Sequence, residues 1–329
     1  MDPLNRRDFL KALSVGVLSP AVVRCELSSQ KPSETKPSTK RQKQKPVSKA
    51  RSADIQDHSY GPNKLNKFDL WLAKSDNPTP LVVYIHGGGF RGGDKSSVSQ
   101  YMLEQTLQSG ISFASINYRL SGEAIYPAQM HDSARAIQYI RKNARQWNID
   151  PKRLAAYGGS AGSGISQWLA FHDDMAKPKS KDPVERESTR LSCAIPFNAQ
   201  DTYDPRQIKK IVPGNAYDHV ALKLLYGLPE DWSWDEDKVD EKLDALLKDA
   251  SPINHLTKDD PPIFVYHFAG SNKPGNIHHP NFGEHLKNKM DELGIECIRR
   301  LDTDYKSPQA ESVEEMVKFL KKHFSMLDI

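Results

Sequence analysis

The feature that most constrains the fold of this 329-residue chain is an alternation of short apolar runs with helical patterns. Residues 81–85 (Leu-Val-Val-Tyr-Ile) form a continuous apolar run, which is typical of a strand buried on both faces. Between Met130 and Trp147, apolar residues recur every three or four positions, which predicts one buried face of a long helix. The other expected strands are 68–73, 111–117, 154–157, 191–197, 262–268 and 296–301, and the other expected helices are 161–171, 282–293 and 312–324.

Strands and helices that alternate in this way form a mainly parallel sheet with helices on both faces. Two segments interrupt the alternation. Residues 174–190 are polar and predict a loop, whereas residues 205–258 contain helical pieces and the pair Trp232 and Trp234. We expect 205–258 to form a helical insertion near the carboxyl edge of the sheet, where open α/β sheets bind ligands. The predicted fold class is therefore α/β with a helical insertion.

The first 52 residues differ in composition from the rest. The pair Arg6 and Arg7, followed by Phe-Leu-Lys and the apolar stretch 12–23, resembles a bacterial twin-arginine export signal. An amphipathic helix with a chance arginine pair is the alternative. Residues 26–52 are rich in Ser, Pro, Lys and Gln, which predicts a disordered linker. We expect a signal peptide at 1–25, a linker at 26–52, a folded domain at 53–329, and export to the periplasm or out of the cell.

The net charge also differs between the first 52 residues and the rest of the chain. The chain holds 46 basic and 42 acidic residues, a net charge of +4, which would suit a nucleic-acid partner. Twelve basic and four acidic residues lie in the first 52, however, so the folded part has a net charge of −4 and no nucleic-acid partner is expected. No apolar run reaches the roughly 20 residues of a membrane span, and no Cys or His cluster has the spacing of a metal site. We therefore expect neither a membrane span nor a metal.

Two glycine-rich loops follow expected strands and carry the chemical signal. Residues 86–90 (His-Gly-Gly-Gly-Phe) follow one strand, and residues 158–162 (Gly-Gly-Ser-Ala-Gly) join another strand to a helix. The second loop places glycines two residues before and after Ser160, so a tight turn can close and lift the hydroxyl above the sheet. At a helix start, the Ala161 N–H can stabilise a developing oxyanion, and the glycines at 87–89 can add donors.

Other interpretations of these glycines fit less well. Residues 87–92 match the G-x-G-x-x-G pattern of dinucleotide-binding folds, but no acidic residue ends the next strand. Residues 158–164 lack the Gly-Lys-Ser/Thr ending of a phosphate-binding loop. The remaining alternative is that the two glycine-rich loops are tight turns with a purely structural role.

Together, the two loops resemble the α/β-hydrolase superfamily, particularly its His-Gly-Gly-Gly esterase and lipase group. That group includes hormone-sensitive-lipase-like and feruloyl or acetyl-xylan esterase-like members. The resemblance runs from about residue 64 to the C-terminus and includes residues 117–120, 126–128 with Asp132, and 251–253. It implies that Ser160 is the nucleophile, that no cofactor is needed, and that the substrate is a small-molecule or carbohydrate ester. It also implies an oxyanion hole built from Gly88, Gly89 and Ala161.

A serine hydrolase also needs a base beside the nucleophile and an acid that orients the base. The family usually places the acid after the strand that corresponds to 262–268, and the histidine after 296–301. Here residues 269–276 contain no carboxylate, and residues 302–307 contain no histidine. Both expected positions are empty.

The pair His278 and His279 lies on the loop where the acid is expected. We therefore consider an exchanged arrangement, in which one of these histidines is the base. The orienting acid would be Asp304 or Asp302, and Asp201 is a further candidate. Alternatively, the two histidines only cap or pack the following helix.

Two function classes stay open at this point. The first is an exported serine esterase that acts on small acyl or carbohydrate esters. The second is a hydrolase-fold protein that has lost efficient turnover and keeps a binding or regulatory role. Ser160 and its loops favour the first class, and the empty acid and histidine positions favour the second.

Overall fold

The computed structural model describes residues 51–235 and 238–326. The expected signal peptide at 1–25 and nearly all of the expected linker lie outside the described residues, so both stay predictions. Within the described part, no helix combines the length and the apolar surface that a bilayer crossing requires.

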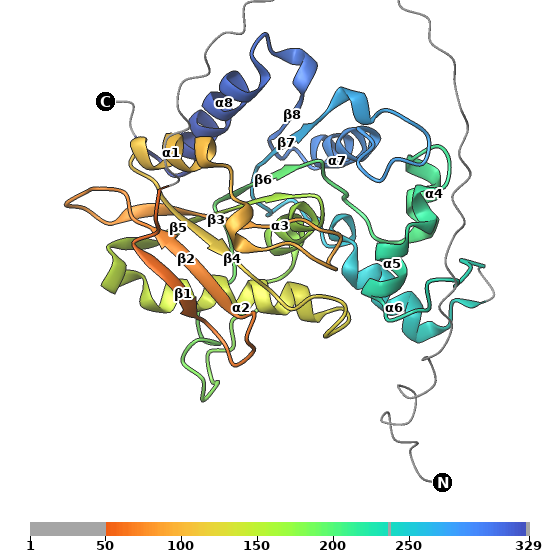
Figure 1. Ribbon diagram of the computed structural model, residues 1–329, viewed down its shortest axis with the longest axis horizontal. Helices are drawn as coiled ribbons and strands as arrows, with labels where there is room; N and C mark the ends of the chain where they lie inside the picture. Colours follow the sequence, from red (N-terminus) through yellow and green to blue (C-terminus); the bar gives the residue numbers. More distant parts are fainter. Residues whose placement is uncertain (1–50, 236–237, 327–329) are drawn as a thin grey trace, which may run out of the picture. The chain divides into compact units, whose positions relative to one another are not determined.

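One eight-stranded sheet runs through the folded part, in the order β1-β2-β4-β3-β5-β6-β7-β8 (Figure 1). The first two strands pair antiparallel with their neighbours, and the other pairings are parallel. The predicted mainly parallel sheet is therefore confirmed. The strands are β1 (Ile55–Ser59), β2 (Lys67–Trp71), β3 (Thr79–Ile85), β4 (Ser112–Ile116), β5 (Ile149–Gly159), β6 (Cys193–Phe197), β7 (Ile263–His267) and β8 (Cys297–Leu301).

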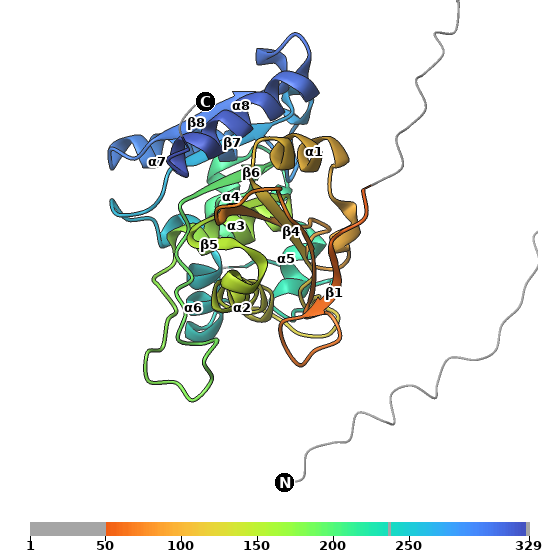
Figure 2. The same ribbon diagram turned by 90° about the vertical axis from the view of Figure 1, so that its left-hand side faces the viewer.

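Helices cover both faces of the sheet because the central strands are apolar on both sides. All seven residues of β3 are buried, as its continuous apolar run predicts. One face packs against α2 (Ala128–Asn143), α3 (Ala161–Phe171) and α7 (Asn281–Glu292). The other face packs against α1 (Gln100–Gln108) and α8 (Pro308–His323), which lie side by side in both views (Figures 1 and 2).

Two elements escape prediction from the sequence pattern. Strand β1 is an edge strand whose residues are half-buried or exposed, so it has no apolar run to reveal it. Helix α1 is only nine residues long, and it begins where the Ser99 side chain accepts a hydrogen bond from the Met102 N–H.

The regular secondary structure described between β6 and β7 is helical, as expected. It contains α4 (Pro205–Ile211), α5 (Val220–Leu225) and α6 (Glu241–Ala250), which gather at one side of the sheet in Figure 1. Residues 174–190 contain neither helix nor strand, in agreement with the predicted loop. Parts of α4 and α5 lie over the carboxyl ends of the central strands, beside Ser160.

Candidate active site

Ser160 occupies a strained turn between β5 and α3. Its backbone angles are φ 52° and ψ −121°, in a region that non-glycine residues rarely adopt. The two flanking glycines permit this turn: a Cβ on Gly158 would overlap the Gly162 carbonyl, and a Cβ on Gly162 would overlap the Ile85 carbonyl. The turn therefore needs glycine at both positions, and it presents the Ser160 hydroxyl at the start of a helix.

His278 lies directly against this hydroxyl. Its Nε2 atom is 2.8 Å from the Ser160 Oγ, within hydrogen-bond distance. The loop between β7 and α7 carries His278, and the Asn276 side chain holds that loop by accepting a hydrogen bond of 2.8 Å from the His278 N–H. Burial lowers the pKa of His278, and the nearby His219 lowers it further. The imidazole is therefore neutral at pH 7, with one ring nitrogen able to accept a proton.

The neighbouring His279 points elsewhere. Its side chain is buried, and its Nδ1 accepts a hydrogen bond of 3.2 Å from the Asn281 N–H at the first position of α7. The structure thus brings His278 to Ser160 and uses His279 to cap a helix. The geometry makes His278, and not His279, the candidate base for Ser160.

No carboxylate among the described residues forms a hydrogen bond with the His278 ring. Asp304 accepts a hydrogen bond of 2.8 Å from the Leu301 N–H, and Asp302 accepts one of 2.6 Å from the Ala269 N–H. Both side chains therefore stabilise the ends of β7 and β8. The structure does not bring Asp304 or Asp302 to His278, because these local backbone donors take their carboxylates.

Asp201, the further candidate acid, has another histidine as its partner. Its buried carboxylate lies 2.5 Å from Nδ1 of His285 on α7, and this hydrogen bond raises the pKa of His285. The pair joins the end of β6 to α7. No sequence motif pointed to His285, because it lies 84 positions from Asp201 and shares no motif with it.

The His-Gly-Gly-Gly loop packs directly on Ser160. A Cβ on Gly87 would lie 3.2 Å from the Ser160 Cβ, and Gly88 and Gly89 have positive φ angles of 109° and 58°. Within the described residues, the N–H groups of Gly88 and Gly89 have no hydrogen-bond partner. The Ala161 N–H stands at the first position of α3, where a helix offers it no acceptor.

The histidine of this loop, His86, holds the loop in place. Its ring stacks on Tyr118 with 4.4 Å between the ring centroids, and the Tyr118 hydroxyl donates a hydrogen bond of 2.8 Å to the His86 carbonyl. Burial lowers the pKa of His86, so it is a neutral packing residue. His86 therefore shapes the loop and does not face Ser160.

A small apolar cavity of about 40 Å³ opens beside Ser160. Helices α4 and α5 supply part of its wall, which the sequence could not place. The larger side chains of the wall are Phe90, Tyr203, Ile208, Leu222, Ile277 and Phe282. A cavity of this size and polarity suits a short apolar group bound next to the hydroxyl.

With this geometry in place, comparison with known proteins identifies the family. The sequence matches the BD-FAE family over residues 68–273, more than half of the chain. The chain belongs to the BD-FAE family. The matched range of this BD-FAE member includes Ser160, both glycine-rich loops and the helical segment after β6, but it ends before His278.

Curated relatives of this BD-FAE protein carry names of ester hydrolases. A probable carboxylic ester hydrolase, LipM of Mycobacterium tuberculosis, is 28% identical over 224 residues, which cover 66% of this chain and 47% of LipM. The carboxylesterase NlhH of Mycobacterium tuberculosis is 36% identical over 91 residues, or 28% of each chain. The matched part of the chain spans about half the length of LipM, and only 28% of the length of NlhH.

Solved structures resemble the chain over most of its length. A truncated carbohydrate esterase from gut microbiota superposes with a TM-score of 0.66 at 20% identity, covering 85% of this chain and 99% of its own. Esterase 2 of Thermogutta terrifontis, phosphonylated by sarin, gives a TM-score of 0.66 at 18% identity, with coverages of 85% and 98%. At these identities the likeness shows the fold, and this BD-FAE member has the α/β-hydrolase fold.

Proposed function

We propose that this protein is a serine-dependent carboxylic ester hydrolase that works through a Ser160–His278 pair. The observation that carries the proposal is the 2.8 Å contact between the Ser160 Oγ and the His278 Nε2. A serine hydroxyl becomes an effective nucleophile when an adjacent neutral base accepts its proton. The ester hydrolase names of LipM and NlhH support the same reaction class.

The reaction begins when Ser160 Oγ attacks the carbonyl carbon of the ester and His278 Nε2 takes the hydroxyl proton. The negative oxygen of the tetrahedral intermediate is stabilised by the free N–H groups of Gly88, Gly89 and Ala161. Protonated His278 then donates its proton to the leaving alcohol, and the acyl group stays on Ser160. Water, deprotonated by His278, completes the cycle by hydrolysing this acyl-enzyme.

This mechanism operates with a dyad, because no described carboxylate contacts the His278 ring. In a full triad the acid fixes the tautomer of the base and stabilises the imidazolium. Here the loop hydrogen bond from His278 N–H to Asn276 positions the residue, and no charged side chain in the described part of the chain hydrogen-bonds to the ring. We therefore propose an esterase of moderate turnover in place of the binding or regulatory alternative.

The cavity beside Ser160 supports a short acyl group, such as acetyl, on the substrate. Its wall is apolar and its volume of about 40 Å³ is small for a long acyl chain. The name of one structural neighbour, a carbohydrate esterase, supports a carbohydrate as the alcohol part. An exported enzyme, as the paired arginines suggest, would meet such esters outside the cytoplasm.

The test uses the purified full chain with p-nitrophenyl acetate and a fluorophosphonate probe. We expect time-dependent labelling and hydrolysis in the wild type, and the loss of both in Ser160→Ala. The Ser163→Ala variant is a matched control, because Ser163 lies on the same turn but donates its hydroxyl to the Ser160 carbonyl. An unlabelled wild-type chain without turnover would reject the esterase proposal.

A further inference from the structure

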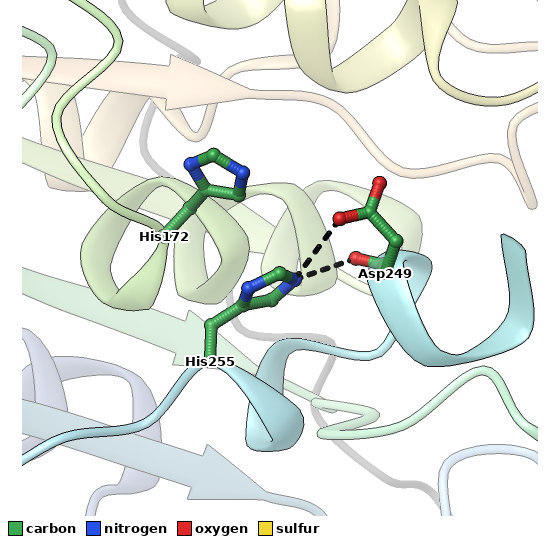
Figure 3. Close-up of side chains that lie close together, drawn as sticks. All are labelled: His172, Asp249 and His255. Carbon is green, nitrogen blue, oxygen red and sulfur yellow. Dashed lines mark hydrogen bonds and ion pairs between the residues drawn. The ribbon is translucent and has the colours of Figure 1, made fainter. Parts of the chain in front are cut away.

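Three side chains outside the candidate active site converge at the far end of α3. His172 follows the last residue of α3, Asp249 lies in the last turn of α6, and His255 follows a short turn after α6 (Figure 3). One donor atom from each side chain lies within 4.8 Å of the other two. Among the described residues, this is the one group of three such donors that could surround a single ion.

Neighbouring groups orient two of these side chains, His172 and Asp249, so that each keeps one atom available to bind an ion. His172 Nδ1 donates a hydrogen bond of 2.8 Å to the Asp173 carbonyl, so Nε2 is the ring nitrogen that remains for a metal ion. The Trp168 indole stacks on the His172 ring with 4.1 Å between centroids and fixes its plane. The Tyr126 hydroxyl donates to one Asp249 oxygen at 2.5 Å and leaves the other oxygen open. Partners of this kind are typical around the ligands of metal ions.

Two features of the electrostatic surroundings favour a cation, and they offset the positive charge of Arg190, which donates to the His172 carbonyl at 3.3 Å. Helices α3 and α6 both end at this cluster, and helix C-termini carry a partial negative charge. Asp249 adds the formal charge of its carboxylate. The two histidines are half-buried and the Asp249 side chain is 49% exposed, so an ion bound here would lose only part of its water shell.

We propose that His172, Asp249 and His255 form a binding site for a divalent transition-metal ion, with Zn²⁺ as the best-matched ion. Two imidazoles and one carboxylate are ligands that Zn²⁺ accepts readily, and water fills the fourth tetrahedral position. His255 Nε2 and the nearer Asp249 carboxylate oxygen are 3.7 Å apart, close to the ~3.4 Å between two ligands on a tetrahedral ion. One rearrangement is needed. His255 Nε2 must give up its 2.7 Å hydrogen bond to the Asp249 backbone carbonyl before it can bind the metal ion.

The bound ion would connect the helical segment after β6 to the helix that begins at Ser160. Helix α3 has 11 residues, so the metal lies about 16 Å from the serine and takes no part in the ester chemistry. Its effect is on stability, because an ion that binds the folded chain shifts the unfolding equilibrium. The sequence could not reveal this site, because its ligands come from separate elements without zinc-motif spacing.

The proposal is tested with the untagged full chain, stripped with a chelator and titrated with ZnCl₂ by calorimetry. We expect one site whose affinity falls at least tenfold in His172→Ala, His255→Ala and Asp249→Asn, with a Zn²⁺-dependent rise of Tm in the wild type. Co²⁺ should give the visible absorption of a four-coordinate ion in the wild type and not in these variants.

His285→Ala is the matched control, because His285 also pairs with an aspartate but has no third ligand. It should bind Zn²⁺ as the wild type does. Asp249→Asn keeps the size of the side chain, so it tests the site even where a histidine variant fails to fold. Wild-type protein without Zn²⁺ binding, or Asp249→Asn with unchanged affinity, would overturn the proposal.

Discussion

The Nε2 atom of His278 lies 2.8 Å from the Oγ of Ser160, although the two residues are 118 positions apart. Ser160 follows β5 and His278 follows β7, and only β6 separates these strands in the sheet. Because parallel strands end at the same edge, their following loops meet there. The contact thus results from the sheet order, and in the proposed mechanism it places the base on the loop after β7.

Substituting the two adjacent histidines should separate catalysis from packing. His278→Ala should lower kcat/KM for p-nitrophenyl acetate by about 10²–10⁴, the usual contribution of a general base. His279→Ala should keep most of the activity and lose about 1 kcal/mol of stability, because it removes the side chain that caps α7. Kinetics and thermal unfolding of both variants measure this contrast. Equal activity losses in the two variants would contradict it.

The sequence predicted the sheet and the tight turn at Ser160 because both depend on local patterns. A continuous apolar run such as that of β3 predicts a buried strand, and the glycines around Ser160 predict a tight turn. The choice between His278 and His279 could not be made, because adjacent residues in a loop have no periodicity that tells which one faces the serine. The role of Asp304 depended on the local Leu301 N–H, and the role of Asp201 depended on His285, which lies 84 positions away in the sequence.

The pH dependence of kcat/KM should show an acid limb below pH 6.5. Burial, together with His219, lowers the pKa of His278 below its ordinary value of 6.5. The neutral ring is the active form, so activity rises as the pH passes upward through this lowered pKa. A pH–rate profile of the wild type measures the limb. A midpoint at or above pH 7 would mean that a carboxylate faces the His278 ring.

Neutralising Asp304 should leave the chemistry almost intact. Asp304→Asn removes a carboxylate that accepts the Leu301 N–H at the end of β8, so kcat/KM should change by less than about threefold. An orienting acid would behave differently, since losing one lowers kcat by about 10⁴ in a serine protease. Steady-state kinetics with a matched Tm measurement decides between the two. A hundredfold loss without unfolding would restore the exchanged triad.

The turn at Ser160 should not tolerate a methyl group at Gly162. In Gly162→Ala the new Cβ overlaps the Ile85 carbonyl, and such overpacking typically costs about 1–3 kcal/mol. Gly270→Ala is the control, because a Cβ there meets no atom within 4 Å. Denaturant unfolding of both variants measures the difference. Two variants of equal stability would show that the turn relaxes without cost.

The wall of the cavity should set the length of the acyl group. We expect kcat/KM to fall from acetate to hexanoate esters, because a cavity of about 40 Å³ offers little room. Ile208→Ala removes part of the wall and should raise the hexanoate-to-acetate ratio several-fold. Ile140→Ala is a matched control, since Ile140 is equally buried but lies on α2, away from the cavity. Truncating either isoleucine lowers stability by about 2–5 kcal/mol. The ratio of kcat/KM for the two esters does not depend on the folded fraction, because both esters are measured on the same variant. An unchanged ratio in Ile208→Ala would place the acyl group elsewhere.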